Sequence, residues 1–241
     1  MSEIWPEWQA DVGPLVDIAD VPKPLRRLVK ATGELDPEML RRYTPYVPDG
    51  ARHSAVLILL GKEPDVLLQL RADTLGAHAG QVSFPGGGAE PGDAGPVDTA
   101  LREAFEEVGV VRDAVRPVAV LPSLLVPVSG YLVTPVVAYW TREQDVTAVD
   151  PGETAAVARI PLAHLADPGY RCSVRLPGRD YVSPAFLVPD MLVWGFTAGV
   201  LTILLELGGW NAEWNTEDVR ELGEAWSDAR ALPPLTGRAR T

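Results

Sequence analysis

The sequence has 241 residues, and its shortage of cysteine and histidine excludes two kinds of structural site. Cys172 is the only cysteine, so no disulfide can form within the chain, and a cytoplasmic location is expected. We expect Cys172 to be a small buried or loop residue. His53, His78 and His164 lie far apart and have no neighbouring cysteine pairs, which argues against a zinc-binding motif.

Positive charge is also scarce. The chain has 21 Lys and Arg residues against 33 Asp and Glu residues, a formal net charge of -12, and no basic stripe. Proteins bind nucleic-acid phosphates through clustered Lys and Arg, so we expect no nucleic-acid partner and no attraction to an anionic membrane. An acidic protein that acts on an anionic substrate needs local compensation, which metal ions and a few arginines such as Arg71 would supply.

No apolar run is long enough to cross a bilayer. The longest, Met191–Leu205, ends at Glu206 and falls short of the roughly 20 residues that a membrane span needs. We interpret it as a buried core helix. The start, Met1–Ile4, lacks the basic residues and the apolar run of a signal peptide. A membrane partner is therefore not expected.

Several short apolar runs bounded by turn residues predict strands. They are Ala55–Leu60, Val66–Leu70, Gln81–Phe84, Val118–Leu121, Pro135–Trp140 and Ala155–Ile160. Strands, one helix, more strands and a long helix follow one another, which predicts a mixed β-sheet between helices, an α/β/α sandwich. We expect an N-terminal extension (1–50) with a helix near Pro37–Tyr43, a main domain (51–207), and a C-terminal part (208–241) with a helix near Thr216–Trp226 and a flexible tail.

An unusual group of acids lies in Arg102–Val110. Residues three and four apart share a face of a helix, so Glu103, Glu106 and Glu107 are expected on one side, with Arg102 beside Glu106. Gly109 is typical of a helix end, where anions oppose the helix dipole. A solvated surface helix explains such a run in isolation, but a divalent cation removes the conflict, because hard cations bind several carboxylate oxygens.

A glycine-rich loop precedes this helix. In Phe84–Gly88, three glycines after a proline let a ligand or metal approach the backbone. Pro96 suits the first turn of the helix, and Asp98 or Thr99 is a candidate to cap or open it. The loop is not followed by Gly-Lys-Ser/Thr, and Pro91 replaces the third glycine of a dinucleotide fingerprint, so both of those motifs fail.

The loop and helix together resemble the Nudix box, G-x5-E-x7-R-E-U-x-E-E-x-G-U, in which U is aliphatic. The second half matches from Arg102 to Val110, with Ala104 at a U position. The first half departs from the pattern: after Gly87 and five intervening residues stands Asp93 instead of Glu, and eight residues instead of seven separate Asp93 from Arg102. This variant is similar to the coenzyme A pyrophosphatase branch of the Nudix hydrolases.

A second segment resembles the same branch, which carries L-L-T-x-R-[SA]-x3-R-x3-G-x3-F-P-G-G before the box. The chain matches it over Leu67–Gly87, except that Gln69 replaces Thr and Gly76 replaces Arg. Loss of that arginine removes one possible phosphate partner. Ser129–Val137 is also similar to this branch, and the resemblance covers roughly 50–207.

The resemblance implies a Nudix fold with a loop-helix catalytic motif and Mg²⁺ or Mn²⁺ as cofactor. Resemblance and helix geometry make Glu103, Glu106 and Glu107 the metal-binding set, and the resemblance adds the Gly87 carbonyl. Divalent cations neutralise a diphosphate and lower the pKa of bound water. We expect Arg102 to orient a glutamate through a charge-assisted bond. The substrate-binding candidates are Arg71, Phe84, Gly86 and Gly87.

Three roles stay open at this point. The proton of the attacking water passes to Glu103 or to Glu153, whose segment Asp150–Glu153 partly resembles an Asn-Pro-x-Glu stretch of the family, although Glu153 fits a turn equally well. Asp93 is either structural or a metal contact, and His78 is either structural or near substrate.

The resemblance favours coenzyme A or an acyl derivative as substrate, with 3′,5′-ADP and a phosphopantetheine as products. NADH, ADP-ribose and a nucleotide sensor without catalysis are the alternatives. The intact Arg-Glu-x-x-Glu-Glu set weighs against a sensor, and a homodimer is a further possibility.

Overall fold

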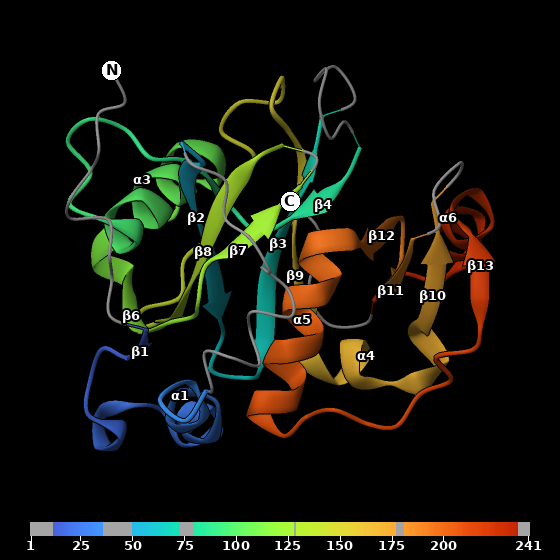
Figure 1. Ribbon diagram of the computed structural model, residues 1–241, viewed down its shortest axis with the longest axis horizontal. Coiled ribbons are helices and arrows are strands. Elements are labelled where there is room, and N and C mark those ends of the chain that lie inside the picture. The colour runs from blue at the N-terminus through green and yellow to red at the C-terminus, as the bar shows by residue number, and fades with distance from the viewer. Residues whose placement is uncertain (1–11, 36–49, 73–79, 128, 177–180, 236–241) are drawn as a thin grey trace. The chain divides into compact units, whose positions relative to one another are not determined.

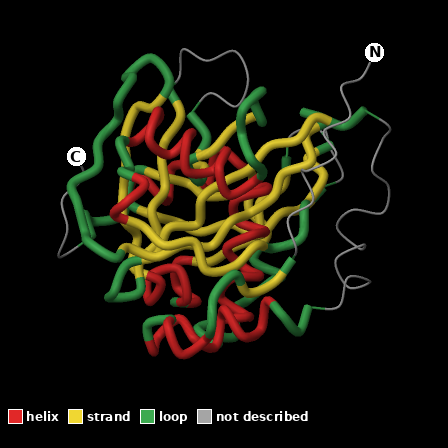
Figure 2. Tube along the Cα trace, turned by 90° about the vertical axis from the view of Figure 1, so that its left-hand side faces the viewer, coloured by secondary structure: helices red, strands yellow, loops and turns green. Residues whose placement is uncertain are grey.

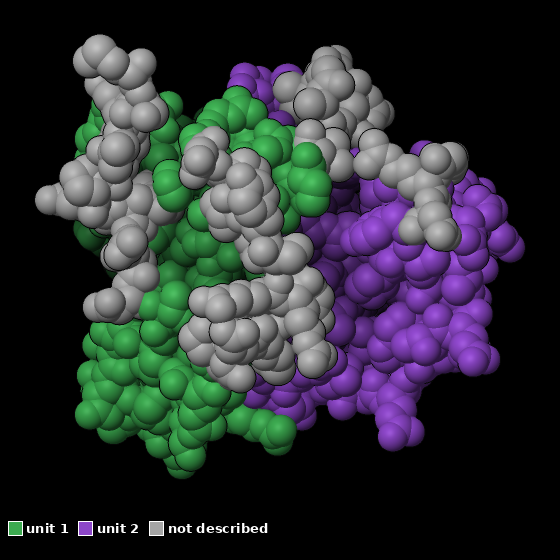
Figure 3. Space-filling view, viewed as in Figure 1, with its two compact units in different colours: residues 1–62, 84–149 green, residues 63–83, 150–241 purple. Residues whose placement is uncertain are grey.

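The computed structural model describes residues 12–35, 50–72, 80–127, 129–176 and 181–235. The expected helix near Pro37–Tyr43, together with Gly76 and His78, lies outside these residues. The chain forms two compact units that alternate along the sequence (Figure 3). Unit 1 comprises residues 1–62 and 84–149, and unit 2 comprises residues 63–83 and 150–241.

Unit 1 is built on a mixed sheet in which β2 and β8 lie side by side (Figure 1). These two strands run parallel in register from Arg52↔Tyr131 to Leu60↔Tyr139, and the other pairings, β1–β6, β6–β8, β7–β8 and β2–β5, are antiparallel. The strands are β1 (Gly13–Pro14), β2 (Arg52–Leu60), β5 (Gly86–Gly88), β6 (Val115–Val120), β7 (Leu124–Val126) and β8 (Tyr131–Trp140).

Helix α3 (Pro96–Val108) packs on this sheet, against β2, β5 and β8. Its buried apolar positions recur at helical spacing: Ala100, Leu101, Ala104 and Val108. Pro96 begins the helix, and Gly109 ends it with a φ of 73°, both as expected. The expectation of a cap at Asp98 or Thr99 is wrong, because the helix starts three residues before Thr99 and its N-cap is Gly95.

The other helices of unit 1 are short. Helix α1 (Arg26–Thr32) contacts β1 and β6 and buries Leu28 and Val29. The described residues of unit 1 also form 3₁₀ turns at Ile18–Asp20, Lys23–Leu25 and Arg112–Ala114.

Unit 2 contains two groups of paired strands. In the first, β3 pairs antiparallel with β4 and with β9; in the second, β10, β11 and β12 are antiparallel and β13 joins β10 in parallel. The strands are β3 (Asp65–Arg71), β4 (Val82–Ser83), β9 (Thr154–Pro161), β10 (Arg171–Arg175), β11 (Val182–Val188), β12 (Met191–Trp194) and β13 (Val219–Glu221).

The helices in the described part of unit 2 are α4 (Leu162–Ala166), α5 (Gly195–Gly208) and α6 (Leu222–Ala231), with a 3₁₀ turn at Pro168–Tyr170. Figure 2 shows the helices of the chain in red and its strands in yellow. Helices α5 and α6 both contact β11 and β12. Cys172 lies on β10 and is buried in a cluster with residues of β11, β12 and α6, as expected for a small buried residue, and burial raises the pKa of its thiol to about 11.

Two expected helices begin later than the sequence suggested. The first four residues of Met191–Leu205 form β12, and the helix starts at Gly195, whose φ is 64°. In Thr216–Trp226, the first part carries β13, and the helix starts at Leu222. In both places a strand pairs with a neighbour that local sequence does not reveal: β12 with β11, and β13 with β10.

The six expected strands are present as β2, β3, β4, β6, β8 and β9, with ends shifted by a few residues. Mixed sheets with packed helices confirm the α/β fold class. None of the helices in the described ranges is long and apolar enough to cross a bilayer. The division at residues 50 and 207 stays a prediction.

Candidate functional site

The site in unit 1 begins with the glycine strand β5. It pairs antiparallel with β2 through Ala55↔Gly87 and Val56↔Gly86. A side chain on Gly86 would collide with the carbonyl oxygen of Ala55, so this position has room only for glycine. A Cβ on Gly87 would enter the carboxylate of Glu103. The sequence therefore places bare backbone directly against an acid of α3.

Glu107 is fixed to the start of the same strand. Its Oε2 accepts a hydrogen bond of 2.9 Å from the backbone N–H of Gly86, and the residue is only 7% exposed. Glu103 and Glu107 are four residues apart, so one helix face presents both carboxylates to the glycine strand. Glu106 lies beside this face and is about half exposed.

Burial raises the pKa of Glu103 to about 7. The positive charge of Arg102 acts in the opposite direction, and the negative charges of Glu107 and Glu106 raise the pKa further. Repulsion between neighbouring carboxylates is relieved by a proton or by a cation. The pair therefore has the chemistry of a site for a hard cation.

Arg102 joins the parts of the site. Its Nη1 lies 3.0 Å from Glu106 Oε2 and 3.1 Å from Glu103 Oε1, while Nη2 donates to the carbonyl of Gly88 at 2.9 Å. The expected pairing of Arg102 with Glu106 is thus present. Its contact with Gly88 ties α3 to the glycine strand.

Asp93 holds the other side of Arg102. Arg102 Nε donates to Asp93 Oδ1 at 3.0 Å and Nη2 donates to Oδ2 at 3.1 Å. Asp93 Oδ2 also accepts from the hydroxyl of Thr99 at 2.7 Å and from the N–H of Glu90 at 2.9 Å. Burial favours a higher pKa for Asp93, but the bonds from Arg102, Glu90 and Thr99 outweigh it and lower the pKa. Asp93 is therefore a buried anchor for Arg102.

The fit of a metal ion depends on rearrangement of these contacts. Within the described ranges, no group of three His, Cys, Asp or Glu side chains is already spaced to hold a metal ion. In this structure Arg102 contacts one carboxylate oxygen of Glu103 and one of Glu106, and the N–H of Gly86 donates to one carboxylate oxygen of Glu107. The hard oxygen donors and the bare backbone of Gly87 suit Mg²⁺ or Mn²⁺. A cation that uses Glu106 must compete with Arg102.

The remaining predicted residues are placed as follows. Phe84 is 1% exposed, so its side chain belongs to the core and supports the loop; a substrate contact by this ring stays a prediction. Arg71 and Glu153 belong to unit 2. The Arg71 carbonyl accepts from Gly80 N–H, and Glu153 is an exposed residue of a turn in which its N–H donates to Asp150. Roles for Arg71 and Glu153 in the reaction stay predictions.

Gln69, which departs from the branch pattern, has a structural explanation in unit 2. It is fully buried on β3, and its Oε1 accepts from the hydroxyl of Thr154 on β9 at 3.1 Å. Sequence reasoning also missed the parts of Thr99 and Glu90 in the Asp93 anchor. The sequence signal for the bond from Thr99 to Asp93 is the position of Thr99, six residues after Asp93 and within the first turn of α3.

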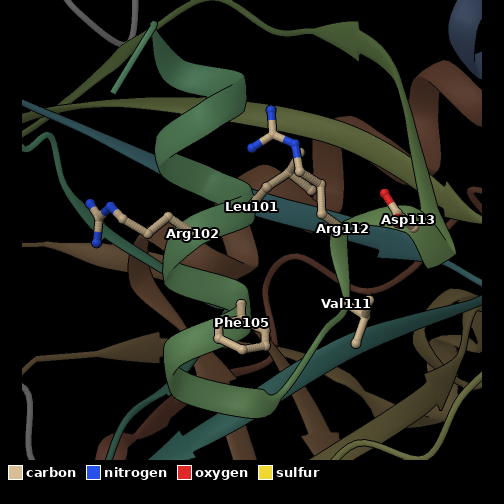
Figure 4. Close-up of a pocket in the computed structure, with 6 residues that line it drawn as sticks. All are labelled: Leu101, Arg102, Phe105, Val111, Arg112 and Asp113. Carbon is tan, nitrogen blue, oxygen red and sulfur yellow. The ribbon is translucent and has the colours of Figure 1, made fainter. Parts of the chain in front are cut away.

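A hollow of about 350 Å³ lies beside α3 and the segment Val111–Asp113 that follows it (Figure 4). Phe105, at 57% exposure, borders it, and Arg102 extends away from Leu101 and Arg112. The lining residues are Leu101, Arg102, Phe105, Val111, Arg112 and Asp113. The three glutamates are not among them, but Arg102, which contacts Glu103 and Glu106, is.

Comparison with known proteins gives consistent similarities. Residues 51–175 match the NUDIX domain family. The uncharacterized Nudix hydrolase NudL of Photorhabdus laumondii is 37% identical over 157 residues, which cover 64% of this chain and 83% of the relative. NudL of Escherichia coli is 38% identical over 162 residues, 65% of this chain and 83% of the relative. The crystal structure of the Nudix hydrolase RenU from M. smegmatis has a TM-score of 0.47 at 18% identity, covering 68% of this chain and 90% of RenU.

Proposed function

This chain belongs to the Nudix family, and we propose that it is a metal-dependent hydrolase that cuts the diphosphate linkage of coenzyme A or an acyl-coenzyme A. The family match and the NudL relatives support the broader assignment, a Nudix hydrolase that acts on a nucleoside diphosphate derivative. The products of the proposed reaction are 3′,5′-ADP and 4′-phosphopantetheine or its acyl form.

One observation carries the proposal. Two neighbouring carboxylates, Glu103 and Glu107, face the backbone of Gly86 and Gly87 at a point where no side chain intervenes. A buried pair of like charges costs stability unless a cation or a proton compensates it. Arg102 compensates part of the charge of Glu103, and the remaining negative charge of the pair supports a site for a divalent cation.

Each side chain has a distinct part in the proposed reaction. Glu103, Glu106 and Glu107, with the carbonyl of Gly87, would hold Mg²⁺ or Mn²⁺, which when bound supplies charge neutralisation and an acidified water. Arg102 positions Glu103 and Glu106 and is itself held by Asp93. The base that accepts the proton of the attacking water would be Glu103 or, alternatively, Glu153.

The choice of coenzyme A is supported by the Leu67–Gly87 and Ser129–Val137 segments, which resemble the coenzyme A pyrophosphatase branch. Arg71, Phe84, Gly86 and Gly87 would contact substrate. The departures at Gln69 and Gly76 leave NADH and ADP-ribose as rival substrates. The single cysteine supports a cytoplasmic location, and a homodimer stays a prediction.

A substrate panel tests the proposal. Purified protein with Mg²⁺ is incubated with coenzyme A, NADH and ADP-ribose, and products are identified by mass spectrometry. We expect the highest kcat/KM for coenzyme A, with 3′,5′-ADP released. A higher kcat/KM for NADH or ADP-ribose would overturn the branch assignment. A nucleotide that binds tightly but survives hours with metal would support a sensor instead.

A further inference from the structure

The proposed substrate carries more negative charge than the diphosphate that is cut. Coenzyme A has an additional phosphate monoester on its ribose, and a protein with a net charge of -12 needs a local cation to attract it. Arg102 is already committed to Asp93, Gly88 and the glutamates, and Arg112 is paired with Asp98. Another arginine of unit 1 is better suited to this task.

Arg52 and Tyr131 form a pair at one end of the unit 1 sheet. They are register partners at the first residues of the parallel strands β2 and β8 (Figure 1). The Arg52 guanidinium carbon lies 4.1 Å from the centre of the Tyr131 ring, and Nη2 donates to the carbonyl of Ser129 at 3.0 Å. These are the contacts of its side chain within the described chain, where it has no carboxylate partner. Among the described residues, the Arg52 charge is therefore oriented by the ring and not paired with an acid.

The pair lies next to the glycine strand. A Cβ on Gly88 would come within 3.8 Å of Tyr131 Cε1 and 3.9 Å of its hydroxyl. Neighbouring residues of a strand face opposite sides of the sheet, so Gly87 faces Glu103 while Gly88 faces Tyr131. The carbonyl of Gly88 also accepts from Arg102. The Gly88 backbone therefore lies between the Arg102 anchor and the Tyr131 ring.

We propose that Arg52, held over Tyr131, binds the 3′-phosphate of coenzyme A, an inference that rests on the proposed function. The ring covers one face of the guanidinium and limits its motion, while the N–H groups that do not donate to Ser129 have no partner among the described residues and can bind an anion. Arginine presents these donors in a fixed fork that matches phosphate oxygens. Glu103, which is proposed to act on the diphosphate, lies on the opposite side of β5.

The test compares substrates with and without this phosphate. For Arg52→Met, we expect kcat/KM for coenzyme A to fall about tenfold, as for loss of a charge-assisted hydrogen bond, while dephospho-coenzyme A is little affected. Arg142→Met is the matched control, because Arg142 is an exposed arginine just beyond the other end of β8. Tyr131→Leu should lower the preference for coenzyme A in the same direction. An equal loss for both substrates, or no loss for either, would overturn the inference.

A binding measurement separates this inference from the proposed reaction. By calorimetry, the wild type should bind 3′,5′-ADP more tightly than 5′-AMP, and Arg52→Met should remove that difference. If the difference is present but coenzyme A is not cleaved, the proposed function fails while the phosphate site stands. If coenzyme A is cleaved but the wild type binds the two nucleotides equally, the inference about Arg52 is wrong and the proposed function stands.

Discussion

Arg102 donates hydrogen bonds to both carboxylate oxygens of Asp93, from Nε to Oδ1 at 3.0 Å and from Nη2 to Oδ2 at 3.1 Å. The side chain of Asp93 is 5% exposed and that of Arg102 is 21% exposed, so water contributes little to this contact. The same guanidinium reaches Glu103, Glu106 and Gly88. The two hydrogen bonds to Asp93 thus fix the position of the Arg102 guanidinium, which contacts Glu103 and Glu106.

Asp93→Asn should destabilise the protein and reduce its activity. The amide cannot accept both N–H donors of Arg102, so we expect a loss of about 2–3 kcal/mol in the free energy of unfolding, as for a broken buried ion pair. Chemical denaturation measures this change. Asp113→Asn, on an exposed residue, is the control and should be nearly neutral. Equal stability of the two variants would show that Asp93 is not an anchor.

The contribution of Asp93 should also depend on pH. Its pKa in the folded state is lowered below the ordinary value of 3.8, so its stabilisation is complete above that value and is lost as pH falls through the folded pKa. The difference in unfolding free energy between wild type and Asp93→Asn should therefore be smaller at about pH 3 than at about pH 6. A difference that is constant or grows on acidification would contradict the lowered pKa.

Gly87 and Gly88 should respond differently to alanine. In Gly87→Ala the new methyl group would enter the Glu103 carboxylate, whereas in Gly88→Ala its nearest neighbour is the Tyr131 ring at 3.8 Å. We expect Gly87→Ala to lower kcat by about 100-fold or more, because displacing a charged group of the site costs transition-state stabilisation. Gly88→Ala is the matched control and should keep most of the activity. Similar rates for both would rule out close contact between Gly87 and Glu103.

Glu107→Gln tests the negative charge of Glu107 separately from its hydrogen bond with Gly86. A glutamine oxygen can still accept the Gly86 N–H, so the melting temperature should change little, while turnover in excess Mg²⁺ should fall by about 100-fold or more. Glu107→Ala also removes the hydrogen bond and should lower both. Glu213→Gln, on an exposed residue of unit 2, is the control. Undiminished turnover by Glu107→Gln would remove Glu107 from the reaction.

Much of the local structure near the site could be predicted from the sequence, because its signals are short-range. The spacing of Glu103 and Glu107, the proline at the start of α3 and Gly109 at its end act within one helix. The register of β2 against β8, which brings Arg52 to Tyr131, depends on strands separated by more than 70 residues and has no local signal.

The wrong helix starts have a similar origin. An apolar run such as Met191–Leu205 suits a buried strand as well as a buried helix, and pairing with β11 decides its first four residues. The Asp93 anchor was only partly foreseen, because a bidentate contact nine residues away in sequence requires the loop before α3 to fold back on the helix.

Metal binding is the central claim, and a Mn²⁺ titration followed by electron paramagnetic resonance tests it most directly. The signal of free Mn²⁺ should decrease as wild-type protein is added, and the Glu103→Gln/Glu107→Gln double variant, folded by circular dichroism, should leave that signal nearly unchanged. Equal Mn²⁺ binding by the wild type and the double variant would contradict the assignment of these carboxylates to the metal site.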